Sequence, residues 1–203
     1  MNKILIIGQN SFIGSNLKKY LSKKFVVTTL SFEKVMNKNQ SFFVQFSHVI
    51  NTAIHKNYIH MNYNKLYDLD RKFISKFKKI NFIYIFLNTR KIYFQKENIS
   101  EISVIKPISN YGRNKFKTET FLKKKLKRKL LSLRIGNIIG KRITKNKRNY
   151  HKLFFDNFLV LRKCKKKIIA ADDYKDFLSI TQFSQIIRAL ISKKINGIYN
   201  VSL

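Results

Sequence analysis

The stretch KILIIGQNSFIGSN, residues 3–16, decides the fold of this chain. The almost wholly apolar run that opens it predicts a strand buried on both faces, as in a parallel sheet. Gly8 ends the run, and Gly14 falls in what should be the first turn of a helix. A strand, a glycine turn and a helix start together predict a diphosphate site, because the helix dipole and its free amides face the anion.

Six residues of this turn are candidate contacts to a dinucleotide. The usual pattern has a middle glycine, and Ser11 stands there instead, so that its hydroxyl can donate to a phosphate. An ordinary strand–turn–helix junction has the same outline, and this alternative stays open for the stretch taken alone. The candidate cofactor-binding residues of the turn are Gly8, Asn10, Ser11, Phe12, Ile13 and Gly14.

Apolar runs and helical patterns alternate along the rest of the chain. This alternation indicates an α/β fold with a mainly parallel, doubly wound sheet of the Rossmann type. Between residues 31 and 46 there is room for one crossover element. The expected strands are 3–7, 25–30, 48–53, 82–87, 130–135, 167–170, 177–180 and 198–201, and the expected helices are about 12–23, 62–79, 110–129, 149–164 and 182–192.

The composition fits one globular domain spanning residues 1–203. The chain is 44% hydrophobic, which is enough for a substantial core. Cys164 is the sole cysteine, which excludes a disulfide framework and fits a reducing compartment. No apolar run approaches the roughly 20 residues of a membrane-spanning helix. We therefore expect a soluble, cytoplasmic protein with no membrane partner.

The formal net charge of +33 arises from 43 Lys and Arg residues against 10 Asp and Glu residues. A balance of this kind suggests a nucleic-acid or anionic-surface partner. The lysines, however, are spread along the whole sequence, as a compositional drift would spread them. We expect no specific nucleic-acid partner, and an anionic small substrate such as a nucleotide suits the same charge.

Polar residues follow two of the expected strands. Ser31 stands where an acid would bind the ribose hydroxyls of NAD. Lys34 favours the extra phosphate of NADP while Glu33 opposes it, so NAD and NADP both stay open. The next strand ends in small residues that leave space for a ligand, and Asn51 and Ala53 are further candidate cofactor-binding residues.

Tyr111 and Lys115 form the candidate catalytic pair. Four residues apart on a helix, they share one face. A phenol beside an ammonium loses its proton more readily and can exchange it with a substrate hydroxyl or carbonyl. A Tyr-x-x-x-Lys spacing is also common by chance. Thr89, a hydroxyl at the end of an apolar strand, can hold the reacting oxygen, or it can simply bond to the backbone there.

Other chemistries lack a matching pattern. The four histidines, His48, His55, His60 and His151, show no metal-ligand spacing with cysteines or acids. Asp172, Asp173 and Asp176 cluster in a turn-like stretch that reads as a polar loop rather than as a metal site. No nucleophile elbow, internal repeat or low-complexity linker is visible. We therefore expect no metal.

Taken together, these pieces resemble the extended short-chain dehydrogenases, the NAD-dependent epimerase/dehydratase group that acts on nucleotide sugars. The resemblance runs the full length of the chain and includes all six glycines. Members usually run near 300 residues, so this chain has a reduced C-terminal substrate-binding part. The matching pieces are Gly8 to Gly14, Asn51-Thr52-Ala53, Thr89 before Lys91-Ile92-Tyr93, Pro107 before Tyr111-Gly112-Arg113-Asn114-Lys115 with Glu119, Leu133 to Gly140, Lys175-Asp176-Phe177 and Gly197 to Val201.

The resemblance implies a role for each candidate residue. Tyr111 would be the acid/base, and Lys115 would bind the nicotinamide ribose and favour the phenolate. Thr89 would hydrogen-bond the reacting substrate oxygen. Asn137 would contact the substrate, and the substrate-binding elements would lie mainly in 137–180.

The resemblance also implies an activity. It is an NAD(P)-dependent reduction, epimerisation or dehydration of a nucleotide sugar, in cell-surface polysaccharide biosynthesis, by a protein that can form a homodimer. One alternative is a catalytically degenerate NAD(P)-binding regulator, against which the intact Thr89, Tyr111 and Lys115 argue. The other is a basic nucleic-acid-binding protein, against which the dispersed lysines argue.

Overall fold

The computed structural model describes residues 2–94, 98–143, 160–164 and 176–202. Six parallel strands form one sheet in the order β2-β1-β3-β4-β5-β8. This topology confirms the expected doubly wound, mainly parallel sheet. The strands are β1 (Lys3–Ile7), β2 (Val26–Leu30), β3 (His48–Asn51), β4 (Ile83–Thr89), β5 (Leu130–Ile135) and β8 (Gly197–Val201).

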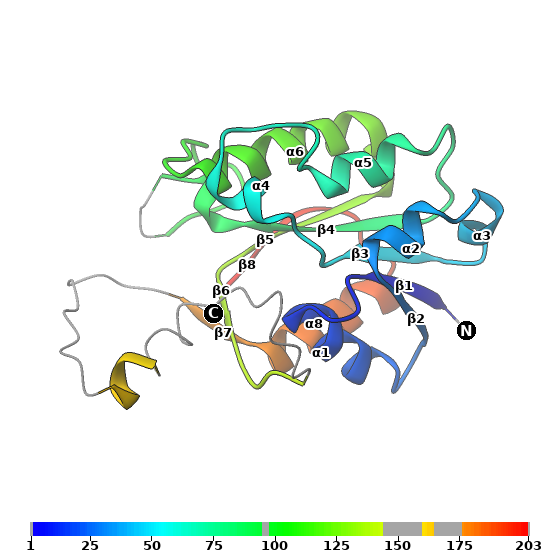
Figure 1. The fold of residues 1–203 in the computed structure, drawn as a ribbon, viewed down its shortest axis with the longest axis horizontal. Helices are drawn as coiled ribbons and strands as arrows, with labels where there is room; N and C mark the ends of the chain where they lie inside the picture. The colour runs from blue at the N-terminus through cyan, green and yellow to red at the C-terminus, as the bar shows by residue number, and fades with distance from the viewer. Residues whose placement is uncertain (1, 95–97, 144–159, 165–175, 203) are drawn as a thin grey trace.

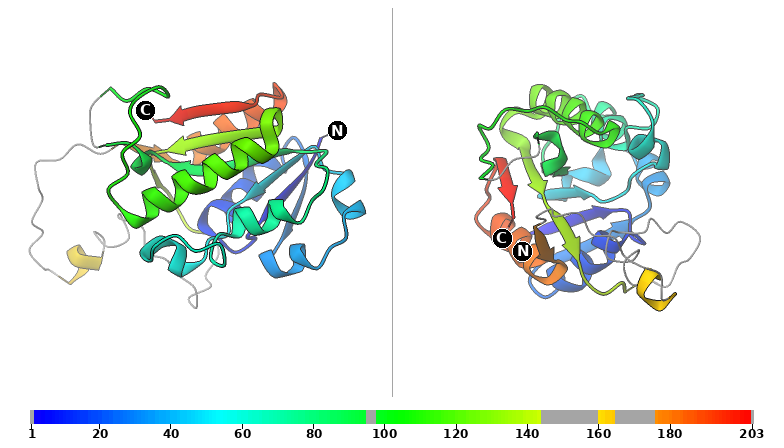
Figure 2. Two further views of the ribbon diagram at one scale, coloured as in Figure 1. Left: turned by 90° about the horizontal axis from the view of Figure 1, so that it is seen from above. Right: turned by 90° about the vertical axis from the view of Figure 1, so that its left-hand side faces the viewer.

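Helices cover both faces of this sheet (Figures 1 and 2). One face is covered by α1 (Phe12–Leu21) and α8 (Ile180–Ser192). The opposite face is covered by α5 (Leu69–Ser75), α6 (Asn110–Leu126) and shorter elements. The shorter elements are α2 (Phe32–Met36), α3 (Ser41–Val44), α4 (Lys56–His60), and the 3-10 turns η1 (Arg90–Ile92) and η2 (Lys127–Lys129).

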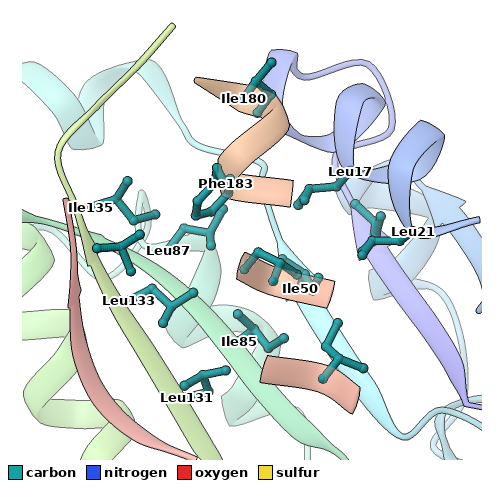
Figure 3. Close-up of a cluster of buried hydrophobic side chains, with 14 of the residues drawn as sticks. Leu17, Leu21, Ile50, Ile85, Leu87, Leu131, Leu133, Ile135, Ile180 and Phe183 are labelled. Atoms are coloured by element: carbon teal, nitrogen blue, oxygen red, sulfur yellow. The ribbon is translucent and has the colours of Figure 1, made fainter. Parts of the chain in front are cut away.

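The side chains under α1 and α8 form an aliphatic core (Figure 3). Leu17 and Leu21 of α1 and Phe183 of α8 meet the sheet there, and all three are fully buried. Alternate residues of the strands form the sheet side of this core, among them Ile50, Ile85 and Leu133. Because both faces of each central strand are covered, the strands had to be apolar throughout, as the sequence indicated.

The opposite face is packed with aromatic rings. Phe43, Phe73, Phe77 and Phe82 lie with ring centroids 4.9–6.4 Å apart, several of them edge to face. Tyr84 joins them, stacked on Phe73 at 5.8 Å. Edge-to-face pairs stabilise the fold beyond the effect of burying their surface, because ring quadrupoles attract in that geometry.

The prediction of one helix over 62–79 is wrong. The chain forms α4, then turns, and then the seven-residue α5. The side chain of Asn64 accepts a hydrogen bond from the Leu66 amide, and the Asp68 carboxylate accepts one from the Arg71 amide. Local side-chain acceptors of this kind close a turn and start a new helix instead of continuing an old one.

Smaller differences concern element ends and the C-terminal part. The crossover before β3 contains two short helices rather than one element. A second, two-stranded parallel sheet joins β6 (Asn137–Ile139) to β7 (Phe177–Ser179), and β6 was not foreseen. Of the expected helix 149–164 only residues 160–164 are described, and 160–163 are helical. The expected strand 167–170 lies outside the described residues.

His48 is a buried histidine whose protonation should weaken the fold. Its side chain is buried at the start of β3, and its Nε2 has no hydrogen-bond partner among the described residues. Burial, and secondly the charge of Lys194, lower the pKa of His48 from 6.5 to about 4. The unfolded chain therefore takes up a proton near pH 6.5 while the folded chain does not. The free energy of unfolding should fall by about 2 kcal/mol between pH 7 and pH 5 from this group.

Urea unfolding at the two pH values measures this fall. His48→Leu should remove the contribution. Lys194→Asn should make it smaller, because Asn keeps the left-handed backbone at this position (φ 52°) and removes the cation. An equal acid-induced loss in the wild type and in His48→Leu would show that other groups are responsible.

Candidate active site

A cavity of about 230 Å³ lies at the carboxyl ends of β4 and β5. In open α/β sheets this edge is where ligands bind. Elements far apart in sequence supply its walls, including the first turn of α1 and the start of α6. The lining residues are Phe12, Ile13, Leu87, Asn88, Thr89, Lys91, Tyr111, Ile135, Gly136, Asn137, Ile138, Ile139 and Phe177.

Two glycines let α1 pack directly on the turn after β3. Gly8 has a left-handed backbone (φ 94°), and a Cβ there would lie 2.7 Å from Thr52 Oγ1. A Cβ on Gly14 would lie 2.5 Å from the Gly8 carbonyl oxygen and 2.6 Å from Thr52 Oγ1. Any larger residue would push α1 away from the sheet edge, so both positions require glycine.

The Ser11 hydroxyl forms its hydrogen bonds within the protein. It accepts a hydrogen bond from the Gly14 amide at 2.8 Å and lies 2.7 Å from Thr52 Oγ1. Thr52 in turn donates to the Ile7 carbonyl at 2.7 Å. Ser11 is therefore the N-cap of α1, and its hydroxyl is engaged by Gly14 and Thr52. The amides of Phe12 and Ile13 are those of the first turn that α1 itself leaves without an acceptor.

Thr89 and Tyr111 meet at the cavity as the sequence predicted. Thr89 ends β4 and is 7% exposed, and Tyr111 lies in the first turn of α6. The Ser109 hydroxyl starts α6 by accepting from the Gly112 amide at 3.1 Å. A Cβ on Gly112 would collide with the Lys91 carbonyl. Glycine there brings α6, and with it Tyr111, close to the segment that follows Thr89.

Lys115 lies one turn further along α6 and is buried, outside the cavity lining. Its Nζ is 3.8 Å from Asp70 Oδ2 and 4.4 Å from the centroid of the Phe86 ring. The Tyr58 ring centroid is 5.8 Å away. The helical spacing thus places Lys115 on the face of Tyr111, as expected, and adds an acidic neighbour that the sequence analysis missed.

Asp70 is the main site residue that sequence reasoning did not find. It is 5% exposed, in the first turn of α5, and burial raises the pKa of its carboxyl while Lys115 acts in the opposite direction. One signal was present in the sequence. Only 10 acids occur in the chain, so an acid within an aromatic-rich segment is unusual enough to inspect.

The remaining predicted cofactor residues surround the carboxyl ends of β1 to β3. Asn51 is buried at the end of β3, where its side chain donates to Asp70 at 2.9 Å and accepts from the Ala53 amide at 3.0 Å. Asn51 therefore shapes the turn from within, and Ala53 lies in that turn. Ser31 caps α2 just beyond β2, and Asn10 is exposed in the turn before α1.

Asn137 lines the cavity and begins the small second sheet. Its side-chain amide donates to the Asp176 carbonyl at 3.1 Å, which ties β6 to the start of β7. The Asp176 carboxylate also forms an ion pair with Arg90, directly after Thr89. This ion pair was not foreseen, and it connects the substrate-side segment to the end of β4.

Neither a metal site nor a membrane helix is found in the part of the chain that the structure describes. No three His, Cys, Asp or Glu residues come together there as a metal would require. No helix in the same residues has the length and apolarity needed to cross a bilayer.

Comparisons with known proteins give structural neighbours only. No protein-family model matches the chain, and no curated protein matches it either. A UDP-N-acetylglucosamine 4-epimerase from Methanobrevibacter ruminantium, in complex with UDP-N-acetylmuramic acid, is 18% identical, with a TM-score of 0.77, covering 100% of this chain and 76% of that one. A dTDP-4-dehydrorhamnose reductase from Clostridium acetobutylicum is 21% identical, with a TM-score of 0.76, covering 98% and 74%.

A third neighbour is a UDP-glucuronic acid 4-epimerase from Bacillus cereus, in complex with UDP-glucuronic acid and NAD. It is 18% identical with a TM-score of 0.76, and the match covers 98% of this chain and 77% of that one. At these identities the likeness establishes the Rossmann-like fold over essentially the whole chain.

Glu119 and Arg134 form a buried ion pair that fixes α6 to the sheet. The shortest contact, from Arg134 Nη2 to Glu119 Oε2, is 2.6 Å, and both side chains are about 5% exposed. Glu119 also accepts from Asn88 at 2.7 Å, beside the cavity. Glu119→Gln leaves the guanidinium without its anion, and we expect it to lower the free energy of unfolding by about 3 kcal/mol.

The double variant Glu119→Gln, Arg134→Met is the matched control, because Gln keeps an oxygen that can accept from Asn88. It removes both charges together and should cost less than Glu119→Gln, as urea unfolding can measure. A double variant less stable than Glu119→Gln would contradict the assignment of the cost to an uncompensated charge.

Proposed function

We propose that this protein is an NAD(P)-dependent enzyme that transfers hydride at a sugar carbon of a nucleotide sugar, as an epimerase, dehydratase or reductase. One observation supports this more than any other. A hydroxyl from β4, a phenol from α6 and the free amides of α1 surround a single cavity at the carboxyl edge of a Rossmann-like sheet. The neighbours of the same fold include enzymes that bind NAD together with a UDP-sugar.

The residues present fit a dinucleotide. Gly8 and Gly14 bring the first turn of α1 against the turn after β3, so the amides of Phe12 and Ile13 would bind the diphosphate. Ser31 and Ala53 would lie beside the adenosine half, and Lys115 would bind the nicotinamide ribose. When bound, the cofactor supplies the hydride acceptor or donor. Either NAD or NADP satisfies this arrangement.

Tyr111 would exchange the proton that accompanies hydride transfer. Its hydroxyl would give a proton to the sugar carbonyl oxygen when the sugar is reduced, and its phenolate would take a proton from the sugar hydroxyl when the sugar is oxidised. Thr89 would donate a hydrogen bond to the same oxygen and so orient it. Lys115 lies one helical turn away on the same face of α6.

The sugar would lie on the side of Asn137, within a substrate-binding part formed mainly by residues 137–180. A chain that acts as one domain, a homodimer, a cytoplasmic location and a role in cell-surface polysaccharide biosynthesis stay predictions. A cofactor-binding regulator without catalysis is the alternative within the same fold. The meeting of Thr89 and Tyr111 at one cavity favours the enzyme.

Binding of the dinucleotide can be tested with one added charge. Asn10 is exposed just before α1, and Asn10→Asp is nearly isosteric. An acid near a helix N-terminus suits the helix dipole, so the fold should tolerate it, while it repels a diphosphate. We expect the wild type to bind NADH or NADPH in calorimetry, and Asn10→Asp to bind roughly tenfold more weakly.

Asn39→Asp is the matched control for that charge. Asn39 is exposed before α3, and its side-chain oxygen accepts from Ser41 and Phe42, which a carboxylate also does. The affinity of Asn39→Asp for the dinucleotide should match that of the wild type. A wild type that binds neither dinucleotide at millimolar concentration would rule out the proposed function.

Proton exchange is tested by Tyr111→Phe, which keeps the ring and removes the hydroxyl. With a substrate found by screening nucleotide sugars, kcat should fall by about two to four orders of magnitude. Cofactor affinity should stay nearly unchanged. Tyr199→Phe, which alters an exposed tyrosine of β8, should retain full activity. Wild-type turnover in Tyr111→Phe would mean that the proton comes from another group.

A further inference from the structure

Asp70 holds two parts of the candidate site at once. Its Oδ1 accepts hydrogen bonds from Asn51 Nδ2 at 2.9 Å and from Tyr84 Oη at 2.6 Å. Its Oδ2 lies 3.8 Å from Lys115 Nζ. One carboxylate in α5 therefore contacts the end of β3, the start of β4 and the face of α6.

Two of these contacts, those with Asn51 and Lys115, lie on the side where the dinucleotide would bind. Through Asn51, whose side-chain oxygen accepts from the Ala53 amide, Asp70 sets the turn after β3. Through its second oxygen it faces the ammonium of Lys115. At 3.8 Å this ion pair is longer than a hydrogen bond, so the N–H groups of Lys115 can still donate to a ligand.

The negative charge, rather than the shape, is the feature that needs an explanation. An Asn side chain could accept from both Asn51 and Tyr84 through its single oxygen. Burying a carboxylate instead carries a desolvation cost that an amide avoids. Among the described groups around it, Asp68 is a second anion, Tyr84 and Asn51 are neutral donors, and Lys115 is the cation. The charge therefore serves Lys115.

We propose that Asp70 is a positioning residue of the active site, which holds Lys115 and the turn after β3 together so that both face the same dinucleotide. This proposal rests on the proposed function for its ligand but not for its geometry. The carboxylate keeps the ammonium over the Phe86 ring, and Asn51 transmits the same anchor to Ala53. Loss of the charge should therefore release Lys115 first.

Asp70→Asn and Tyr84→Phe form a matched pair for the test. Both remove part of the interaction at Asp70, but only the first removes the charge that faces Lys115. In calorimetry Asp70→Asn should bind the dinucleotide about tenfold more weakly, and the pH profile of kcat should shift. Tyr84→Phe should keep both the affinity and the profile. Identical behaviour of the two variants would reduce Asp70 to a structural role and overturn the proposal.

A double variant keeps the test valid if Asp70→Asn folds poorly with an unpaired ammonium. Lys115→Met removes that ammonium. If Asp70 acts through Lys115, then adding Asp70→Asn to Lys115→Met should change the dinucleotide affinity less than twofold. A further tenfold loss in the double variant would show an independent effect and would contradict the proposal.

A measurement without cofactor separates this proposal from the proposed function. Acetic anhydride labelling followed by mass spectrometry reports how readily the Lys115 amine reacts. Lys115 should be acetylated several-fold faster in Asp70→Asn than in the wild type. In Tyr84→Phe it should be acetylated at the wild-type rate. If this holds while the wild type binds no dinucleotide, the proposed function fails and the coupling of Asp70 to Lys115 stands. Equal labelling in all three proteins would overturn the coupling.

Discussion

The contact between the first turn of α1 and the turn after β3 sets the geometry of the whole carboxyl edge. Gly14 lies against the Gly8 carbonyl and Thr52 so closely that no side chain fits between them. The Ser11 and Thr52 hydroxyls close the same contact. Because α1 also packs on α8 and on the aliphatic core, its position there fixes where its free amides stand relative to β4 and β5. A shift of α1 would therefore open the cavity and displace the free amides of its first turn.

Buried charges fix the helix α6, which bears Tyr111 and Lys115, in its place on the sheet. In a chain with only 10 acids, Asp68, Asp70 and Glu119 are all buried. Asp68 caps α5, while Asp70 and Glu119 each face a cation on the helix or strand opposite. Unpaired buried charges are strongly destabilising, so each of these pairs constrains how α5, α6 and β5 can be placed. The position of Tyr111 and Lys115 follows from these anchors as much as from the helix that bears them.

The sequence predicted the sheet well because its signals are local. Apolar runs marked β1, β3, β4 and β5, and glycines marked the turns that need them. Thr89 and Tyr111 meet because Thr89 ends β4 and the first turn of α6 lies at the same edge of the sheet. Other features depend on distant partners and could not be predicted. The Asp70–Lys115 pair joins residues 45 positions apart, and the Ser11 hydroxyl contacts Thr52, which is 41 positions away.

Part of the positive charge lies where the topology of the sheet favours it. In sequence the lysines are dispersed, but every long helix of a doubly wound sheet ends at the amino edge of the strands. Exposed lysines gather at these ends, including Lys18, Lys19, Lys23, Lys24, Lys78, Lys79, Lys123, Lys124, Lys125, Lys127, Lys193 and Lys194. Three of the described acids, Glu33, Asp68 and Asp70, lie instead at helix starts. Cations at helix C-termini and anions at N-termini both suit the helix dipole. The lysine-rich edge lies opposite the cavity, and its lysines suit the helix C-termini at which they stand.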